Sequence, residues 1–223
     1  LQDTVFVNPQ FIIKAFADVL TVKHRGFIKS DGILHVKDLQ HLWQGKRRQF
    51  SDASLIQLFQ LFDVAIRLDK DRLLVPALLS DSAPPYVHDH WSFGLDDQDD
   101  LTATPPDHSL FRRNYIFRFL PIGFFSKIIA QCYRSMNWEV ICHWKGGIVC
   151  RSSDFERALA TFDEQSFVLR LRVEGNRYST MLTHFVQLID TIIKGCYANA
   201  QYEVVIPVRD EETREFCNIQ RDE

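Results

Sequence analysis

The sequence predicts an α+β protein with two subdomains, and three observations lead to this prediction. Residues 1–80 combine helical apolar stripes with one hairpin pattern, whereas residues 110–209 are dominated by the two-residue period of β-strands. Between them, residues 81–109 have no apolar periodicity and contain two Pro-Pro and two Asp-Asp pairs, which indicates a flexible linker. Residues 210–223 read as a charged tail. We therefore expect a mostly helical first part, a linker, and a second part in which helices pack on an antiparallel sheet.

The bulk composition is that of a globular intracellular protein. Among 223 residues, 46% are hydrophobic and 25% are charged, so a normal core needs no metal or disulfide. The net charge is −3, which supplies no general basic field for nucleic acid or anionic lipid. No apolar run approaches the roughly 20 residues of a membrane helix. Five cysteines without a regular framework favour reduced thiols and a cytoplasmic location, and Leu1 in place of Met suggests a piece of a longer polypeptide.

The helices of the first part follow recognisable start signals. Asn8-Pro9 can begin a helix, which we expect to bury an apolar face. A small helix follows near Leu39, and Ser51 or Asp52 can cap another helix. The face expected to pack inward in the first helix consists of Ile12, Ile13, Phe16, Val19 and Leu20.

A β-hairpin ends the first part. Residues 64–68 and 72–76 flank the turn at Asp69-Lys70-Asp71. Helices followed by a terminal hairpin have the order of a winged helix, a fold that often binds DNA. The hairpin and the preceding helix carry acidic and apolar side chains, and Lys46-Arg47-Arg48 is the only tight basic cluster. The element order makes a winged-helix nucleic-acid-binding module the alternative reading. The shortage of basic side chains does not favour it.

The second part has the predicted order β-α-β-β-β-β-α-β. Two hairpins are expected around His143–Gly146 and Asp163–Gln165, and a long helix is expected over 178–196. The helix carries an apolar stripe of more than three turns, enough to cover an antiparallel sheet. A last strand is expected over 202–207.

The stretch 113–129 changes from a strand to a helical period at Pro121. Tyr115, Phe117 and Phe119 share one face of the strand, and Pro121 cannot continue its hydrogen-bond ladder. The following helix has an apolar stripe at Phe124, Phe125, Ile128 and Ile129. Such periodicity is first of all a core signal.

The sequence shows no catalytic, cofactor-binding or metal-binding residues. It lacks the phosphate-loop, dinucleotide, zinc-protease and nucleophile-elbow motifs. His88, Asp89 and His90 lie in the expected linker and are read as solvated. His143 could serve a hydrolase only with a partner that the sequence does not show, so we read it as structural.

Four segments resemble the COR domain of Roco proteins, which follows the Ras-like Roc GTPase domain. They span nearly the whole chain in order, and leucine-rich-repeat kinases of this family are similar. The segments are Asp3–Phe11 with Val19–Lys23, Gly32–Leu34 with Leu39 and Trp43, Phe62–Ile66 with Leu74–Ser80, and Tyr115–Ile129.

The resemblance implies a regulatory and dimerisation domain in intracellular signalling. It would couple the Roc domain to the rest of the chain, form a homodimer through the second COR subdomain, and in many members precede a serine/threonine protein kinase domain. GTP and Mg²⁺ would bind in the neighbouring Roc domain. Neither nucleic-acid binding nor membrane insertion is implied. The residues of the strand–Pro–helix corner that would face the GTPase are Phe119, Leu120, Pro121, Phe124 and Phe125.

Overall fold

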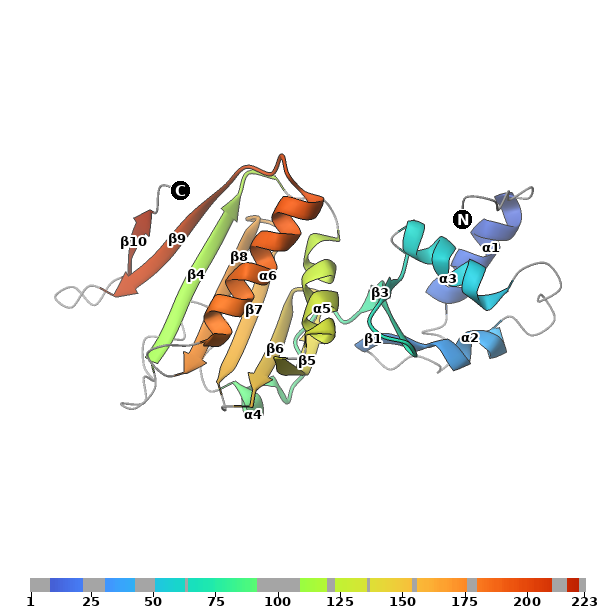
Figure 1. Ribbon diagram of the computed structural model, residues 1–223, viewed down its shortest axis with the longest axis horizontal. Coiled ribbons are helices and arrows are strands. Elements are labelled where there is room, and N and C mark those ends of the chain that lie inside the picture. Colours follow the sequence, from blue (N-terminus) through green and yellow to red (C-terminus); the bar gives the residue numbers. More distant parts are fainter. Residues whose placement is uncertain are drawn as a thin grey trace. The chain divides into compact units, whose positions relative to one another are not determined.

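The computed structural model divides the chain into two compact units, Leu1–Asp81 (unit 1) and Ser82–Glu223 (unit 2). Both units mix helices with antiparallel sheet, as the α+β prediction requires (Figure 1). The structure describes residues 9–21, 31–42, 51–62, 64–91, 109–119, 123–135, 137–153, 156–175, 180–209 and 216–220. The basic cluster Lys46-Arg47-Arg48 lies outside these residues.

Unit 1 places three helices around a three-stranded antiparallel sheet of order β1-β3-β2. The expected terminal hairpin is present as β2 and β3. The winged-helix description of this order stays a prediction. In chain order the elements are α1 (Pro9–Leu20), β1 (Asp31–His35), α2 (Val36–Leu42), α3 (Asp52–Leu61), β2 (Ile66–Arg67) and β3 (Arg72–Leu79).

Short polar contacts set the boundaries of these elements. Ser51 is the N-cap of α3, and its Oγ accepts the Ser54 amide at 3.2 Å. In the hairpin turn, the Asp69 carboxylate accepts the amides of Asp71 and Arg72 at 2.8 and 2.9 Å. Partial burial opposes ionisation of Asp69, but these amides together with the Arg72 guanidinium, whose Nε lies 2.6 Å from Oδ2, outweigh it and hold the pKa of Asp69 below the ordinary value.

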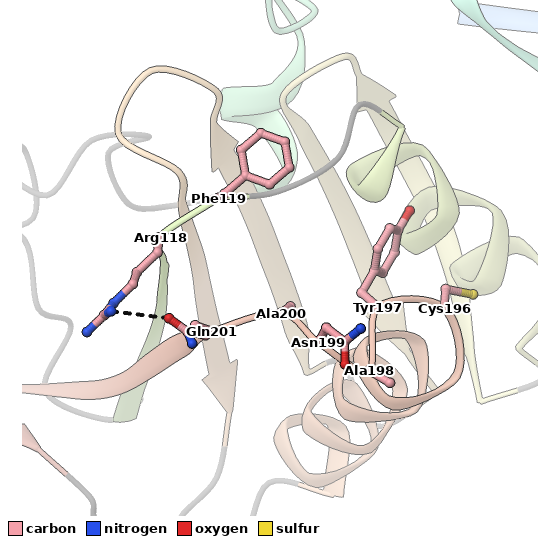
Figure 2. A pocket seen from close by; sticks show the side chains of 8 residues that line it. All are labelled: Arg118, Phe119, Cys196, Tyr197, Ala198, Asn199, Ala200 and Gln201. Atoms are coloured by element: carbon pink, nitrogen blue, oxygen red, sulfur yellow. Dashed lines mark hydrogen bonds between the residues drawn. The ribbon is translucent and has the colours of Figure 1, made fainter.

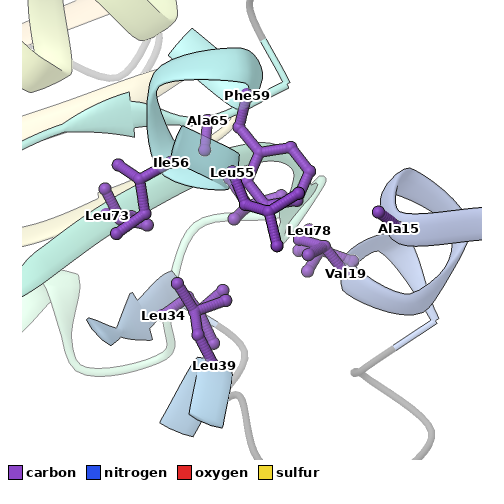
Figure 3. Packing of buried hydrophobic residues seen from close by; sticks show 11 residues of the cluster. Ala15, Val19, Leu34, Leu39, Leu55, Ile56, Phe59, Ala65, Leu73 and Leu78 are labelled. Carbon is purple, nitrogen blue, oxygen red and sulfur yellow. The ribbon is translucent and has the colours of Figure 1, made fainter. Parts of the chain in front are cut away.

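The core of unit 1 lies where the three helices meet the sheet (Figure 3). Within the described part of α1, Ala15 and Val19 are buried and Phe16 packs against the core. Two expected core residues are not buried, because Ile13 is 67% and Leu20 40% exposed. The core-facing side of α1 is centred near Val19, so only part of the predicted apolar stripe faces the core. The core residues are Ala15, Val19, Leu34, Leu39, Leu55, Ile56, Phe59, Ala65, Leu73, Val75 and Leu78.

Unit 2 is built on a seven-stranded antiparallel sheet of order β10-β9-β4-β8-β7-β6-β5. The element order of the prediction is found, with one helix before it and one strand after it. The elements are α4 (Val87–His90), β4 (Ser109–Phe117), α5 (Phe124–Arg134), β5 (Trp138–Trp144), β6 (Gly147–Ser152), β7 (Arg157–Asp163), β8 (Val168–Gly175), α6 (Thr180–Cys196), β9 (Tyr202–Arg209) and β10 (Phe216–Gln220).

Helices α5 and α6 lie over one face of this sheet (Figure 1). The Trp138 indole of β5 stacks on Phe185 of α6 with ring centroids 4.7 Å apart. Phe125 of α5 stacks on Phe162 of β7 at 6.0 Å. The predicted stripe of α6 is buried at Met181, Phe185, Ile189, Ile192 and Ile193. The apolar periodicity of this helix was therefore sufficient to identify its core-facing side.

A remote carboxylate caps the N-terminus of α6. The Glu156 side chain is 8% exposed and accepts the Met181 amide at 3.2 Å. A Cβ at Gly175 would lie 2.9 Å from the Glu156 carboxylate, so a larger residue there would displace this side chain. Glu156 is therefore a capping carboxylate of α6.

Part of the expected flexible linker is packed onto the second face of the sheet. Val87 and Trp91 are each 1% exposed and pack against Trp144, Val149 and Leu159. Because strand side chains alternate between faces, Leu159 points away from the face that Phe162 presents to α5. The prediction of a flexible linker over 81–109 is thus wrong for residues 82–91, where Val87 and Trp91 pack on the sheet. Residues 92–108 lie outside the described part of the chain.

The predicted charged tail contains a strand. Residues Phe216–Gln220 form β10, which pairs antiparallel with β9 in the register Phe216↔Arg209. Charged residues on both sides of this five-residue segment concealed it in the sequence. Among the helices of the described residues, none combines the length and the apolar character needed to cross a membrane.

Candidate interdomain interface

Strand β4 and helix α5 flank the strand-to-helix corner. Strand β4 ends at Phe117, and Arg118 and Phe119 follow it. Gly123 precedes α5 with φ of 90°, a left-handed conformation that glycine adopts without strain. Leu120 and Pro121 lie outside the described residues.

The structure separates the described members of the predicted interface into two environments. Phe119 is 67% exposed, whereas Phe124 and Phe125 are 1% and 4% exposed. The Phe124 ring lies 5.3 Å from Phe117 and 5.4 Å from Tyr197. Phe124 and Phe125 therefore belong to the core of unit 2, and Phe119 is the described member that a partner can reach.

The backbone around Phe119 is held by the neighbouring strand and turn. The Arg118 amide donates to the Gln201 carbonyl at 3.1 Å, and Arg118 Nη1 donates to Gln201 Oε1 at 3.1 Å. The Phe119 ring lies 6.2 Å from the ring of Phe167, a residue with φ of 54°. An L-residue in this conformation carries strain that the surrounding contacts must offset. The exposed ring thus directly follows a hydrogen-bonded residue and lies beside Phe167.

A hollow of about 450 Å³ lies beside Phe119, between the end of β4 and the turn from α6 to β9 (Figure 2). Tyr197, the residue that follows α6, lines this hollow. Lys127 Nζ lies 5.1 Å from the Tyr197 ring centroid. The other lining residues are Arg118, Phe119, Cys196, Ala198, Asn199, Ala200 and Gln201. A hollow with two aromatic side chains and several amide groups can accept an apolar side chain together with hydrogen-bonding groups.

A second hollow, of about 340 Å³, lies between the C-terminal end of α5 and the middle of α6. Arg134, Trp138 and His184 are among its lining residues, and the Trp138 indole donates to the Cys132 carbonyl at 3.2 Å. Sequence reasoning identified neither hollow. Each is formed by short segments from separate elements. The local signals of the first hollow are Phe119, which the sequence singled out as an interface residue, and Tyr197, an aromatic residue just past a helix end.

Several polar side chains of unit 2 are buried. His143 is 6% exposed, and its Nδ1 lies 3.1 Å from the Tyr133 hydroxyl. Burial raises the pKa of the Cys142 thiol to about 11 and the pKa of Cys150 well above its ordinary value, and it also raises the pKa of Tyr115. His88, Asp89 and His90 all lie in the short helix α4, and the described residues contain no cluster of His, Cys, Asp and Glu able to hold a metal ion.

Known families and proteins match both units. The family described as "C-terminal of Roc, COR-A domain" matches residues 1–79, and "C-terminal of Roc, COR-B domain" matches residues 108–221. The probable serine/threonine-protein kinase pats1 of Dictyostelium discoideum is 28% identical over 201 residues, which is 86% of this chain and 6% of that protein. The probable serine/threonine-protein kinase roco7 of the same organism is 23% identical over 205 residues, again 86% of this chain and 7% of that protein.

A third relative, the probable serine/threonine-protein kinase qkgA of Dictyostelium discoideum, is 27% identical over 67% of this chain and 10% of its own length. The chain thus spans a tenth or less of these curated relatives. The COR-B match alone covers more than half of the chain, and the COR-A match covers most of unit 1. The chain therefore belongs to the C-terminal of Roc family and is the COR region, a regulatory region associated with a Roc domain, of a Roco protein.

Proposed function

We propose that this COR region couples an adjacent Roc GTPase domain to the rest of a multidomain, cytoplasmic signalling protein, and that Phe119 is a contact point for the Roc domain. A serine/threonine protein kinase domain follows in the parent chain, and unit 2 forms a homodimer. GTP and Mg²⁺ bind in the Roc domain, so the COR region acts by contact and not by chemistry.

The exposed Phe119 ring is the observation that carries this proposal. It is 67% exposed beside a 450 Å³ hollow, although its two neighbours in the corner, Phe124 and Phe125, are buried. Covering a phenylalanine side chain completely is worth about 1.5–3 kcal/mol, so a partner that covers the exposed part of this ring gains a useful fraction of that energy. A single such anchor can dominate the energy of an interface.

The contacts behind Phe119 give a physical route for coupling. Two residues earlier in the chain, Phe117 packs on Phe124 at 5.3 Å, and Phe124 packs on Tyr197 at 5.4 Å. The end of β4, the start of α5 and the residue after α6 are therefore packed against one another. A Roc domain that contacts Phe119 differently in its two nucleotide states would bias the position of this group.

The comparisons support the proposed context. Both matched families are described by their position C-terminal to Roc. The relatives pats1, roco7 and qkgA are named as probable serine/threonine-protein kinases. A parent chain with a Roc domain before this region and a kinase domain after it would account both for the family descriptions and for the names of the relatives.

The coupling is tested by nucleotide release from a polypeptide that contains the Roc domain and this chain. We expect Phe119→Ala to change the GDP dissociation rate at least about fivefold, the lower end of ordinary allosteric coupling. Tyr86→Ala is the matched control, because Tyr86 is another exposed aromatic residue of unit 2, at 50% exposure, far from the corner in sequence. Equal rates, within twofold, for the wild type and both variants would overturn the role of Phe119.

Self-association is tested separately by sedimentation equilibrium of the same polypeptide. A concentration-dependent rise from monomer to dimer mass is the expected result. A monomer at every concentration up to about 100 μM, with GDP and with a GTP analogue, would remove the homodimer from the proposal.

A further inference from the structure

Three arginines lie together on the face of the unit 2 sheet opposite to α5 and α6. Arg112 of β4 and Arg172 of β8 are cross-strand partners on adjacent strands (Figure 1), and Arg170 lies two residues from Arg172 on the same face. Leu159 of β7 identifies this face, because it is the partner of Arg172 on the other side and belongs to the apolar cluster of Trp91. We call Arg112, Arg170 and Arg172 the arginine cluster.

The arginine cluster is costly unless negative charge lies near it. Like charges on directly opposite residues of neighbouring strands destabilise a sheet, and Arg112 and Arg172 are such a pair. Arg172 is also 1% exposed, and a buried charge is tolerated only with compensating charges and hydrogen bonds. This part of the sheet therefore favours an anionic group.

The strands that carry the cluster supply part of that negative charge. Glu174 Oε2 lies 4.0 Å from Nη1 of Arg157, its cross-strand partner. Asp163 Oδ2 accepts the Ser166 hydroxyl at 2.6 Å. This hydrogen bond is the largest cause of an Asp163 pKa below the ordinary value, and the charge of Arg170 is a smaller cause. On this face of β4, β7 and β8, four arginines thus accompany two carboxylates, which leaves a net charge of +2.

The complementary charge is present in the same chain. Residues 92–108 contain five aspartates and neither lysine nor arginine, so their formal charge is −5. Four of the five aspartates fall within Asp96–Asp100, which we call the acidic run. Like charges in so short a run repel one another, and guanidinium groups relieve this repulsion through charge-assisted hydrogen bonds.

Both ends of this segment are fixed at the face that carries the arginine cluster. Trp91, the residue before the segment, is 1% exposed and belongs to the same apolar cluster as Leu159. Leu110, two residues after the segment, packs against that apolar cluster and lies two residues before Arg112 on β4. The segment therefore begins and ends beside the arginine cluster.

The distances allow the acidic run to reach the arginines. Neighbouring strands are about 4.8 Å apart, and Arg172 lies one strand, and Arg112 two strands, from Leu159. The five residues from Trp91 to Asp96 can span up to about 17 Å. A tether of this length gives the run an effective concentration in the millimolar range at the cluster, which favours it over anions supplied by other molecules.

We propose that the acidic run Asp96–Asp100 docks on the arginine cluster, so that the chain covers this part of its sheet with its own aspartates. The docked run neutralises the cluster and keeps nucleic acid and anionic lipid away from it. This contact lies within unit 2, and it depends neither on the Roc contact nor on the self-association of the proposed function.

The first test joins the two partners covalently in the full chain. Arg170→Lys keeps the positive charge, and a water-soluble carbodiimide then forms an amide between the introduced amine and a carboxylate in contact with it, with loss of water. Peptide mass spectrometry is expected to find position 170 linked to an aspartate of the acidic run. Arg151→Lys is the matched control, because Arg151 Nη2 lies 2.9 Å from Glu139 Oε2 on the same face, and it is expected to link to Glu139 only.

The second test follows amide hydrogen exchange of residues 92–108. Neutralising the acidic run is expected to speed this exchange at least about fivefold, and about 1 M NaCl is expected to do the same in the wild type, because it shortens the screening length to about 3 Å. The variant carries Asp96→Asn, Asp97→Asn, Asp99→Asn and Asp100→Asn. The matched control neutralises residues 210–212 with Asp210→Asn, Glu211→Gln and Glu212→Gln, and is expected to leave the exchange within twofold of the wild type.

Three results would overturn the proposal. One is a position 170 that links only to carboxylates outside the acidic run. Another is exchange of residues 92–108 that is equal in the wild type and in both neutralised variants. The third is a link to the acidic run found only in species of twice the chain mass, because a second copy would then supply the aspartates.

Discussion

Phe124→Ala and Phe119→Ala, compared in the full-length chain, distinguish the core side of the corner from its exposed side. Phe124 is 1% exposed and packs against Phe117, Phe162 and Tyr197 with ring centroids 5.3–6.1 Å apart. Truncating such a residue removes its burial energy and leaves a cavity, which costs about 3–5 kcal/mol. Phe119 is 67% exposed and its ring lies beside that of Phe167, so its truncation is expected to cost no more than about 1 kcal/mol.

The assay is urea unfolding followed by tryptophan fluorescence. Trp91, Trp138 and Trp144 all lie in unit 2, so three of the four tryptophans report on the unit that contains the corner. The expected result is a gap of at least about 2 kcal/mol between the two variants, with unchanged m-values. Equal destabilisation by both variants would refute the separation of the corner into a core side and a contact side.

Three further substitutions test other parts of the structure. Ser51→Ala removes the cap of α3 and should lower the free energy of unfolding of unit 1 by about 1 kcal/mol in urea titrations; no loss would exclude the cap. Gly123→Ala should destabilise unit 2 by about 1 kcal/mol or more because φ is 90°. Gly195→Ala lies in helix α6 with open space around it and should be neutral or stabilising by up to about 1 kcal/mol. A change in the free energy of unfolding of the same sign for both variants would contradict this. Burial raises the pKa of Cys142 from 9.0 to about 11, so at alkaline pH the folded state keeps a proton that the unfolded state loses. The contribution of this thiol to the free energy of unfolding is full below about pH 9 and is lost as pH rises through 11. Cys142→Ala should therefore reduce the slope of the free energy of unfolding against pH in this range by an amount corresponding to up to one proton.

The parts of the fold that the sequence predicted well are those in which local pattern and tertiary packing agree. Helix α6 shows its stripe over more than three turns, and the sheet-facing residues Phe185 and Ile189 are fully buried, as expected. The hairpin turn at Asp69 and the cap at Ser51 rest on hydrogen bonds between residues two or three positions apart, which a sequence reveals directly.

The parts that were missed depend on partners distant in sequence. Trp91 follows a proline-rich segment, and only the second face of the sheet, with Trp144 and Leu159, explains its burial. Strand β10 has little pattern of its own and forms by pairing with β9. In α1, the apolar stripe is wider than the surface that unit 1 covers, so Ile13 and Leu20 remain exposed.

The candidate site was only partly legible for the same reason. The run of aromatic residues at the corner was visible in the sequence, but its division into buried Phe124 and exposed Phe119 depends on the positions of Phe167, Tyr197 and Gln201. These residues come from two turns that lie far from β4 along the chain. Periodicity assigns a side chain to a face, and it does not specify which loops will surround that face.

The central claim, that the Roc domain contacts the corner of unit 2, is tested most directly by hydrogen–deuterium exchange of the turn 197–201. In the isolated chain this turn lines the hollow beside Phe119, with the Ala200 amide bonded to the Tyr197 carbonyl at 2.8 Å. We predict that a preceding Roc domain slows exchange of these amides, to different extents with GDP and with a GTP analogue, and that Phe119→Ala removes this protection. Exchange rates that are the same with and without the Roc domain, in both nucleotide states, would contradict the account.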